Sequence, residues 1–369
     1  MYQVMIRTIT IILSVSANNN FLIEGWQLDT TAWKKSPIYM WLKKELKKTY
    51  RYYYDNMDDG HKVYYKKIFN AVLSFETTVK LPLMDVPTCE KIYRQCICDN
   101  PLFFYVDNII FGIGPLGIAI DIQYSMKEKE VADTVMIIQS ELESLNIACR
   151  FLSDLEKEEY IHHYLIEKAQ YELNDSLPVH SAHSVFVNNK AVCDGISKAA
   201  KILMDSVGIR SIVISGNSFH PNTPGTGGGH AWNIVWVDDK PYHVDFTFDN
   251  NLSDKGTLIR YDYFNLSEEQ IKKDHNYDDV GVYASFTNDW FRLKGLYFDK
   301  KKDVKMYVKS GIQRKVKTLG FRIPFTANPD KTISEMKMLI TTVIRENVVG
   351  EISYSLSINK EQMVIYILF

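Results

Sequence analysis

The fold is decided at residues 191–203, AVCDGISKAAKIL, where a short strand-like lead-in turns into a helix at a single cysteine, Cys193. Apolar residues recur at spacings of three, four and seven from Ile196 to Val207, which predicts one buried helix face. Gly208 follows, as glycine commonly does at the end of a helix. The pattern therefore predicts that Cys193 lies at a helix N-terminus.

A cysteine in this position has two explanations. Unpaired backbone N–H groups and the positive end of the helix dipole stabilise a thiolate, and the same N–H groups can hold a developing oxyanion. A free cysteine is more ordinarily a small buried hydrophobe. Cys193 is the candidate nucleophile. Catalytic partner residues elsewhere in the chain would favour this explanation over a buried structural cysteine.

A β-hairpin is predicted downstream, around Asp238-Asp239-Lys240-Pro241. Its strands cover 230–237 and 242–248. With the turn centred on Asp238-Asp239, Asp245 lies opposite Trp232 and diagonal to His230 on the same face of the sheet. The preceding residues 216–229, rich in Gly, Pro, Asn, Ser and Thr, are expected to form a loop.

Cys193, His230 and Asp245 supply the nucleophile, the base and the orienting group of a Cys-His-Asp triad. His230 would accept the thiol proton and return it to the leaving group, and Asp245 would fix the imidazole tautomer. Taken singly, His230 could be a packing histidine at a strand end, and Asp245 a carboxylate near a turn.

Two rival arrangements use other residues. His243 is a second candidate base, but the hairpin register puts it opposite Ile234, farther from the loop that a substrate could reach. A zinc site is also conceivable, although no metal-ligand spacing supports it. Its ligands would be Cys193, His220, His230 and Asp245.

Four motifs in this order resemble the core motifs of the bacterial transglutaminase-like superfamily, over roughly residues 155–274. They are AVCDG at 191–195, GHAWN at 229–233, YHVDFT at 242–247 and YDYF at 261–264. The resemblance implies a papain-like α+β core in which the cysteine helix packs on an antiparallel sheet that carries the histidine and the aspartate.

The resemblance also implies roles for individual residues. Cys193 would be the nucleophile, His230 the general base and acid, and Asp245 the orienting carboxylate. His183 stands where many relatives carry a tyrosine near the active site, and its N–H could donate to an oxyanion. Trp232 is a candidate wall for the substrate, although core packing would explain it as well.

The expected fold class is α+β, with the transglutaminase-like core flanked by two further regions. A chain of 369 residues exceeds the size at which a single core stops growing. Residues 1–150 are predicted as a helix-rich α+β region with a small sheet, 151–280 as the catalytic domain, and 281–369 as a small C-terminal α+β domain.

Periodicity predicts the remaining elements. Helical patterns cover residues 26–75, 127–149, 153–173 and 333–344, with a helical start at 267. Strand patterns cover 103–106, 109–111, 118–124, 209–215, 304–308, 313–323, 350–357 and 362–369. Ser153 and Glu156 match a capping box, and His162 and His163 point in different directions on that helix, as packing or surface residues.

Composition argues against several partners. The formal net charge is -2, with 43 basic and 45 acidic side chains, so no global field attracts nucleic acid or an anionic membrane. No apolar run has the length of a membrane span, and the five cysteines are too few for a disulfide scaffold. A cytoplasmic protein is expected, or a secreted or cell-surface one if residues 1–17 act as a signal peptide.

The leading hypothesis is a thiol acyltransferase or hydrolase that acts on amide bonds of a protein or peptide substrate. A Cys193 thioester would be resolved by an amine or by water, and the water-resolved alternative is a cysteine peptidase or amidase. The second alternative is a non-catalytic binding or scaffold module. No cofactor is implied, and without an acidic loop of the right spacing the site is expected to be independent of calcium and other metals.

Overall fold

The structure, a computed structural model, describes residues 11–13, 30–114, 117–173, 178–219, 227–348 and 352–369. It is 47% helical and 22% strand, which confirms the α+β class. The chain forms two compact units. The N-terminal unit contains Gln3–Ile214 and Ala231–Asp238, and the C-terminal unit contains Ser215–His230 and Asp239–Phe369. The predicted three-domain division stays a prediction.

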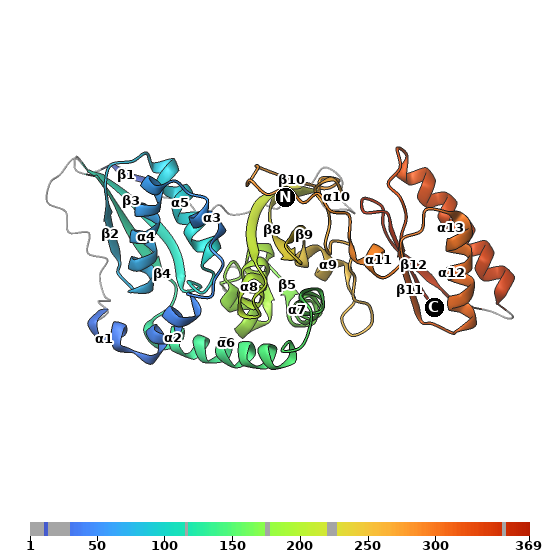
Figure 1. Cartoon of the computed structure of the whole chain (residues 1–369), viewed down its shortest axis with the longest axis horizontal. Helices are drawn as coiled ribbons and strands as arrows, with labels where there is room; N and C mark the ends of the chain where they lie inside the picture. The colour runs from blue at the N-terminus through green and yellow to red at the C-terminus, as the bar shows by residue number, and fades with distance from the viewer. Residues whose placement is uncertain (1–10, 14–29, 115–116, 174–177, 220–226, 349–351) are drawn as a thin grey trace. The chain divides into compact units, whose positions relative to one another are not determined.

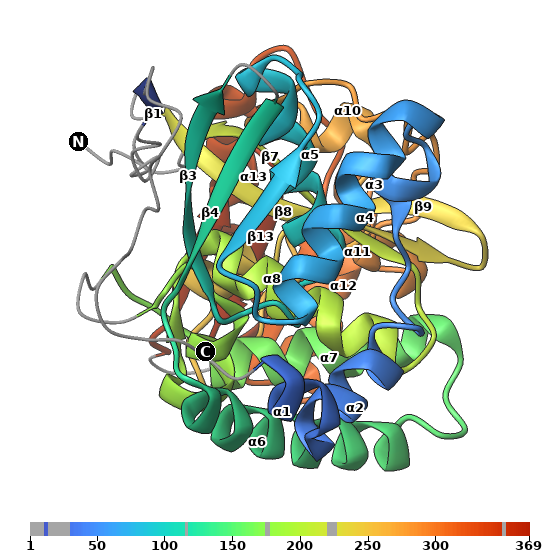
Figure 2. The same cartoon turned by 90° about the vertical axis from the view of Figure 1, so that its left-hand side faces the viewer.

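The N-terminal unit begins with a four-stranded sheet in the order β1-β3-β4-β2, with helix α4 packed against strand β2 (Figures 1 and 2). The strands are β1 (Ile11–Leu13), β2 (Thr78–Leu81), β3 (Val106–Gly114) and β4 (Gly117–Tyr124). The helices are α1 (Thr30–Lys35), α2 (Pro37–Glu45), α3 (Tyr52–Asp55), α4 (Asp59–Leu73) and α5 (Val86–Asp99).

The helical pattern predicted over 26–75 is confirmed in its described part as the four helices α1 to α4, and the strands predicted at 109–111 and 118–124 are confirmed within β3 and β4, whereas residues 26–29 lie outside the described residues. β3 and β4 pair as an antiparallel hairpin. Residues 103–105 lie before β3 and are not part of a strand, contrary to the prediction. Their aromatic side chains are buried, and Tyr105 stacks on Phe75 at 4.7 Å between ring centroids. Aromatic content therefore reflects core packing here, not strand backbone.

Two helices lead from this sheet to the cysteine. They are α6 (Glu128–Ala148) and α7 (Asp154–Lys168), and the predicted capping box of Ser153 and Glu156 is present. His162 is fully buried on α7, and burial lowers its pKa to about 3, whereas His163 is exposed. Strands β5 (Gln170–Tyr171) and β6 (Lys190–Ala191), the π-helical turn η1 (Ser184–Asn188) and helix α8 (Cys193–Ser206) follow.

A second four-stranded sheet has the order β10-β7-β8-β9, from β7 (Ser211–Phe219), β8 (Gly227–Val237), β9 (Lys240–Val244) and β10 (His275–Tyr277). The predicted two-residue turn is confirmed, since Asp238 and Asp239 both have positive φ, as a type I′ hairpin turn requires. The predicted loop at 216–229 is wrong at its two ends, because β7 continues to Phe219 and β8 begins at Gly227. Residues 220–226 lie outside the described residues.

The second predicted strand of the hairpin is also too long. β9 ends at Val244, and residues 246–252 form helix α9 (Phe246–Leu252) instead. The Asp245 carboxylate accepts from the backbone N–H groups of Thr247 and Phe248, which is the geometry of a helix N-cap. Asp245 therefore begins a helix and does not sit within a strand.

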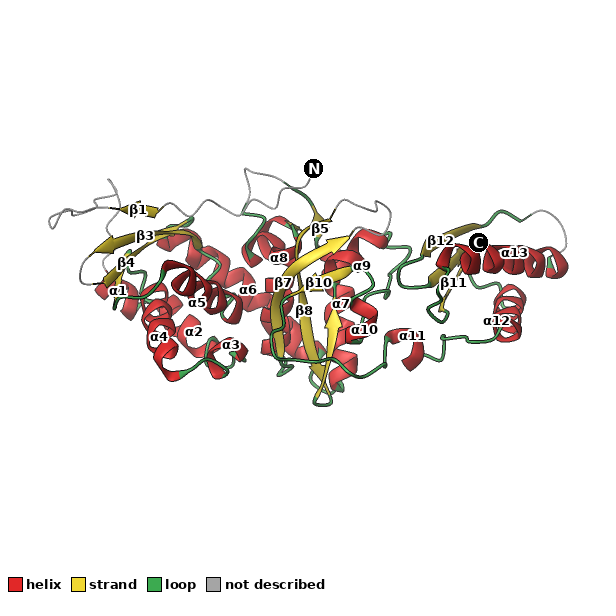
Figure 3. Ribbon diagram, turned by 90° about the horizontal axis from the view of Figure 1, so that it is seen from above, coloured by secondary structure: helices red, strands yellow, loops and turns green. Residues whose placement is uncertain are grey.

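The rest of the C-terminal unit comprises two short helices, two longer ones and a three-stranded sheet in the order β11-β13-β12. Helices α12 and α13 pack against each other beside this sheet (Figures 1 and 3). The elements are α10 (Glu268–Ile271), α11 (Trp290–Leu293), α12 (Lys301–Gln313), β11 (Thr318–Arg322), α13 (Pro329–Asn347), β12 (Ser355–Asn359) and β13 (Val364–Leu368). The predicted strand at 304–308 is wrong, because these residues lie within α12.

Candidate active site

Cys193 is the first residue of α8, as predicted, and its side chain is half-buried. Helix α8 is fastened to the strand that follows His230. The Ser197 hydroxyl lies 3.0 Å from the Ala231 carbonyl, and the Asn233 amide donates to the Ser197 carbonyl at 3.1 Å. These polar contacts are buried, so the helix that carries the cysteine is packed on β8, as the sequence predicts.

The first turn of α8 is held by a charged cluster. Asp194 accepts from His180 at 2.9 Å and pairs with Lys198 at 3.2 Å, and Lys198 also donates to the His180 carbonyl. Burial by itself would raise the pKa of Asp194, but Lys198 and His180 lower it. Gly195 allows the close approach of this turn to its surroundings, because a Cβ there would lie 2.4 Å from the Val179 carbonyl oxygen.

The other four cysteines lie in environments that disfavour ionisation. Burial raises the pKa of Cys89 and of Cys98 to about 11. It also raises the pKa of Cys149, and it raises that of Cys96 well above its usual range. All five cysteines are free thiols. Only a thiolate is a strong nucleophile, so these four should react slowly with electrophiles at neutral pH.

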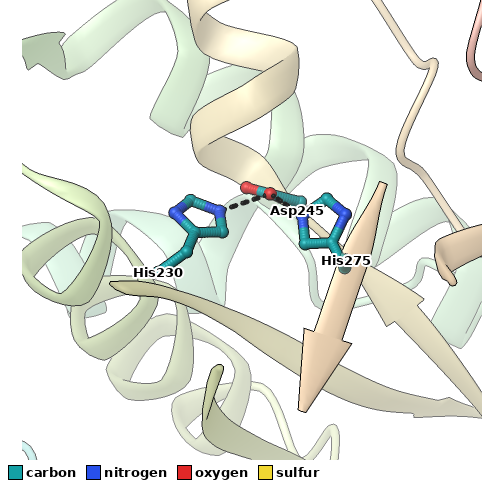
Figure 4. Close-up of side chains that lie close together, drawn as sticks. All are labelled: His230, Asp245 and His275. Atoms are coloured by element: carbon teal, nitrogen blue, oxygen red, sulfur yellow. Dashed lines mark hydrogen bonds and ion pairs between the residues drawn. The ribbon is translucent and has the colours of Figure 1, made fainter. Parts of the chain in front are cut away.

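The structure brings two of the predicted site residues together in the C-terminal unit. His230 Nε2 donates to Asp245 Oδ2 at 2.6 Å (Figure 4). Asp245 is fully buried and His230 is 8% exposed. The backbone positions the carboxylate, because its other oxygen, Oδ1, accepts from Thr247 N at 2.9 Å and Phe248 N at 3.0 Å. Asp245 is thus fixed by the start of α9 and faces the imidazole of His230.

A residue that the sequence analysis missed joins this pair. His275, the first residue of β10, donates from Nε2 to the same oxygen, Asp245 Oδ2, at 3.0 Å (Figure 4). Its other ring nitrogen, Nδ1, lies 2.6 Å from Asp274 Oδ1. His275 is 2% exposed. His275 reaches Asp245 through the long-range pairing of β10 with β7. The local sequence offered one signal, the aspartate that directly precedes this histidine.

The ionisation of Asp245 follows from these contacts. Burial alone would raise its pKa, but the charge of His230 and the hydrogen bonds from His230 and His275 hold it well below its usual range. The carboxylate is therefore ionised at neutral pH and only accepts hydrogen bonds. Since it binds Nε2 of His230, any proton exchange with a substrate or a thiol falls to Nδ1.

The three side chains are also of types that bind metals. One ligand atom from each of His230, Asp245 and His275 lies within 4.8 Å of the others. A tetrahedral zinc site with ligands at 2.0–2.1 Å would separate its donor atoms by roughly 3.3 Å. Here both nitrogens lie closer than that to a single carboxylate oxygen, at 2.6 and 3.0 Å. The contacts have the lengths of hydrogen bonds, so a proton fits this arrangement better than a metal ion.

The remaining candidates occupy other positions. His183 precedes η1, and its ring stacks on Phe104 at 6.3 Å between centroids. Burial lowers the pKa of His183, which favours the neutral ring. Trp232 is fully buried, which is what core packing would require. The oxyanion role of the first and the substrate-wall role of the second stay predictions.

The rivals to the triad fare differently. His243 is fully buried and contacts Glu268 at 3.1 Å and Tyr277 at 3.2 Å. Burial lowers its pKa despite the bond to Glu268. These two contacts involve neither His230 nor Asp245. His220, which the zinc alternative needs, lies outside the described residues.

Comparisons with solved structures found partial likenesses. One is a crystal structure of a TGase, 16% identical, which covers 38% of this chain and 43% of that one with a TM-score of 0.28. Another is a protein from Cytophaga hutchinsonii described as a candidate cysteine protease, 14% identical, covering 35% of this chain and 51% of that one with a TM-score of 0.25. The matches span about half of those chains or less. A comparison with curated proteins found no match.

A scan against family models gave a specific match. Residues 146–246 match the core model of the transglutaminase-like superfamily. The matched segment includes Cys193, His230 and Asp245. Among the described residues, no helix combines the length and apolar character needed to cross a bilayer. The sequence resemblance is thereby confirmed, and residues 146–246 form a domain of the transglutaminase-like superfamily.

Proposed function

We propose that the protein is a thiol enzyme that acts on amide bonds of protein or peptide substrates through a Cys193 thioester. The observation that carries the proposal is the 2.6 Å hydrogen bond between His230 and the buried, ionised Asp245. This pairing fixes the imidazole tautomer and stabilises its cation, which is what a base for a thiol requires. Cys193 at the start of α8 supplies the thiol.

The proposed reaction has two steps. His230 takes the proton of the Cys193 thiol, and the sulfur attacks the amide carbonyl carbon, with backbone N–H groups at the start of α8 as donors to the oxyanion. The C–N bond breaks, the leaving amine or ammonia takes the proton from His230, and a thioester remains. An incoming amine or water then loses a proton to His230 and attacks the thioester, which releases the new amide or acid and returns the thiol.

The first prediction concerns the reactivity of Cys193. Iodoacetamide should modify Cys193 faster than the other four cysteines well below pH 8, because burial keeps those four protonated. Peptide mapping by mass spectrometry after timed alkylation measures all five rates in one sample. His230→Gln should slow the reaction at Cys193 alone. Reaction of Cys193 only near pH 8.5, where a free thiol ionises, would contradict the proposal.

A paired assay separates the activities. Incorporation of a fluorescent amine into a glutamine-containing protein reports transamidation, whereas release of ammonia without incorporation, or new peptide N-termini, reports hydrolysis. Cys193→Ala should abolish each of these signals, and addition of a chelator should leave them unchanged. A protein that binds peptides but yields no product in either assay, with an unreactive Cys193, would be the non-catalytic module instead.

A further inference from the structure

A histidine lies between two buried carboxylates next to the His230–Asp245 pair. His275 contacts Asp245 Oδ2 at 3.0 Å through Nε2 and Asp274 Oδ1 at 2.6 Å through Nδ1. The side chains of all three are at most 1% exposed. Because an ionised carboxylate only accepts hydrogen bonds, both ring nitrogens of His275 have to carry a hydrogen when both carboxylates are ionised. In that state the contacts of His275 are those of an imidazolium.

The far carboxylate is itself held in place. The Tyr263 hydroxyl donates to Asp274 Oδ2 at 2.6 Å, and Gln362 Nε2 donates to the same oxygen at 3.2 Å. Gln362 lies in the turn between β12 and β13 and also donates to the Gln270 carbonyl at 3.1 Å. A chain of contacts thus runs from the three-stranded sheet through Asp274, His275 and Asp245 to His230.

The groups around His275 favour its charged form. Asp274 and Asp245 face its two nitrogens, while the rings of His230, Phe248 and Tyr263 pack around it at 4.9 to 5.7 Å between centroids. Charge repulsion between His275 and His243 contributes to the lowered pKa of His243. Burial alone would lower the pKa of His275, but the hydrogen bonds and charges of the two aspartates raise it above the usual value.

We propose that His275 is a positioning residue of the thiol site, a permanently protonated bridge that fixes the Asp245 carboxylate against His230. The proposal rests on the proposed function. Two donors meet at Asp245 Oδ2 and two backbone N–H groups at Oδ1, so rotation of the carboxylate breaks several hydrogen bonds at once. When both aspartates are ionised, the bridge carries one positive charge between two negative ones, and loss of that positive charge would disfavour a thiolate formed near His230.

The activity test uses alkylation of Cys193 by iodoacetamide, followed over pH, in the full-length protein. His275→Gln should lower the plateau rate on the order of tenfold to a hundredfold, because a loosened carboxylate misplaces His230. It should also move the midpoint of the pH profile upward, since loss of a positive charge disfavours the thiolate. A structural role alone would lower the melting temperature and leave the midpoint in the folded protein unchanged, and that result would overturn the proposal.

His230→Gln is the reference that separates this proposal from the proposed function. If Cys193 is unreactive in the natural protein, or reacts equally fast in His230→Gln, the proposed function fails. If Cys193 depends on His230 but His275→Gln matches the natural protein in rate and midpoint, only the role of His275 fails.

A second measurement does not require the variant to be active. Histidine labelled with ¹⁵N in the ring should show one side chain that keeps two N–H protons well above pH 6.5, and that signal should be missing in His275→Gln. Asp274→Asn should let this ring lose a proton near neutral pH, because one carboxylate partner is gone. A neutral His275 at pH 7 in the natural protein would overturn the proposal. So would a stoichiometric metal ion in the purified protein that His275→Gln loses.

Discussion

At the scale of single residues, the site depends on the one oxygen that Asp245 presents to two histidines. Asp245→Asn keeps the shape of the side chain but can turn an N–H₂ group toward the nitrogens of His230 and His275, both of which donate in the natural protein. His230 would then adopt the wrong tautomer. We expect alkylation of Cys193 to slow on the order of a hundredfold or more, the usual share of a general base.

The matched control for this variant is the rival histidine. His243→Gln removes a buried contact of 3.1 Å to Glu268 and should lower the melting temperature, but alkylation of Cys193 should keep its rate. Asp245→Asn keeps an oxygen that can cap α9, but it should also lower the melting temperature, because the neutral amide loses the charge-assisted hydrogen bonds from His230 and His275. Equal slowing of alkylation in both variants would show that His243 takes part in the proton chain and that our assignment of the base is wrong.

At the scale of elements, the start of α8 depends on a glycine that packs against backbone. A Cβ on Gly195 would lie 2.4 Å from the Val179 carbonyl oxygen, so Gly195→Ala has to displace the first turn of the helix. We expect a loss of about 1–3 kcal/mol, as for other overpacked sites, together with slower alkylation of Cys193 two residues away. Thermal unfolding and the alkylation assay measure the two effects.

Gly208, at the other end of the same helix, offers the control. Its φ of +81° strains any other residue, but an added Cβ would meet nothing within 4 Å. Gly208→Ala should therefore cost about 1 kcal/mol through the backbone alone and leave Cys193 reactivity unchanged. Slower alkylation in both glycine variants would mean that general loosening of α8, and not the displaced first turn, governs the thiol.

The sequence predicted elements well where one local pattern was decisive. The helix at Cys193 and the turn at Asp238-Asp239 are both as expected, because periodicity and turn chemistry act over a few residues. The prediction that residues 246–248 continue the strand was wrong. Their side chains favour a strand, but the carboxylate of Asp245 caps the helix α9 that begins at Phe246. The predicted strand at 304–308 was wrong. Val304 and Val308 are four residues apart, a helical spacing, and both lie on the buried face of α12.

The site was predictable only in part, for a physical reason. His230 and Asp245 belong to neighbouring parts of one hairpin, so local register places them together. His275 lies thirty residues beyond Asp245 and reaches it because β10 pairs with β7. That pairing depends on the packing of the whole sheet and not on a local sequence pattern. No spacing rule in the sequence reports such a pairing.

At the scale of the whole molecule, the YDYF motif ties the C-terminal sheet to the rest of its unit. Arg260 forms a bidentate pair with Asp262 at 2.8 and 2.6 Å and also donates to Ser357 on β12. Arg322, on β11, donates to the Asp262 carbonyl and pairs with Asp289 at 3.0 Å. The motif therefore anchors β11 and β12, the two strands that flank β13. Gln362, directly before β13, donates a hydrogen bond to Asp274.

The last prediction tests this anchor with Arg322→Met. Loss of the buried Arg322 leaves Asp289 with the half-exposed Arg292, at 3.2 Å, so the cost should be less than about 3–5 kcal/mol, the cost of a buried charge left without any partner. We still expect a lower melting temperature and faster proteolysis within residues 296–369. Lys360→Met removes an exposed pair with Asp330 at 3.3 Å and should change stability by less than about 1 kcal/mol.

If the sheet supports the site through Gln362 and Asp274, Arg322→Met should also slow alkylation of Cys193 at temperatures where the protein is still folded. An unchanged alkylation rate beside a lowered melting temperature would instead make the C-terminal sheet a separate module that contributes stability alone.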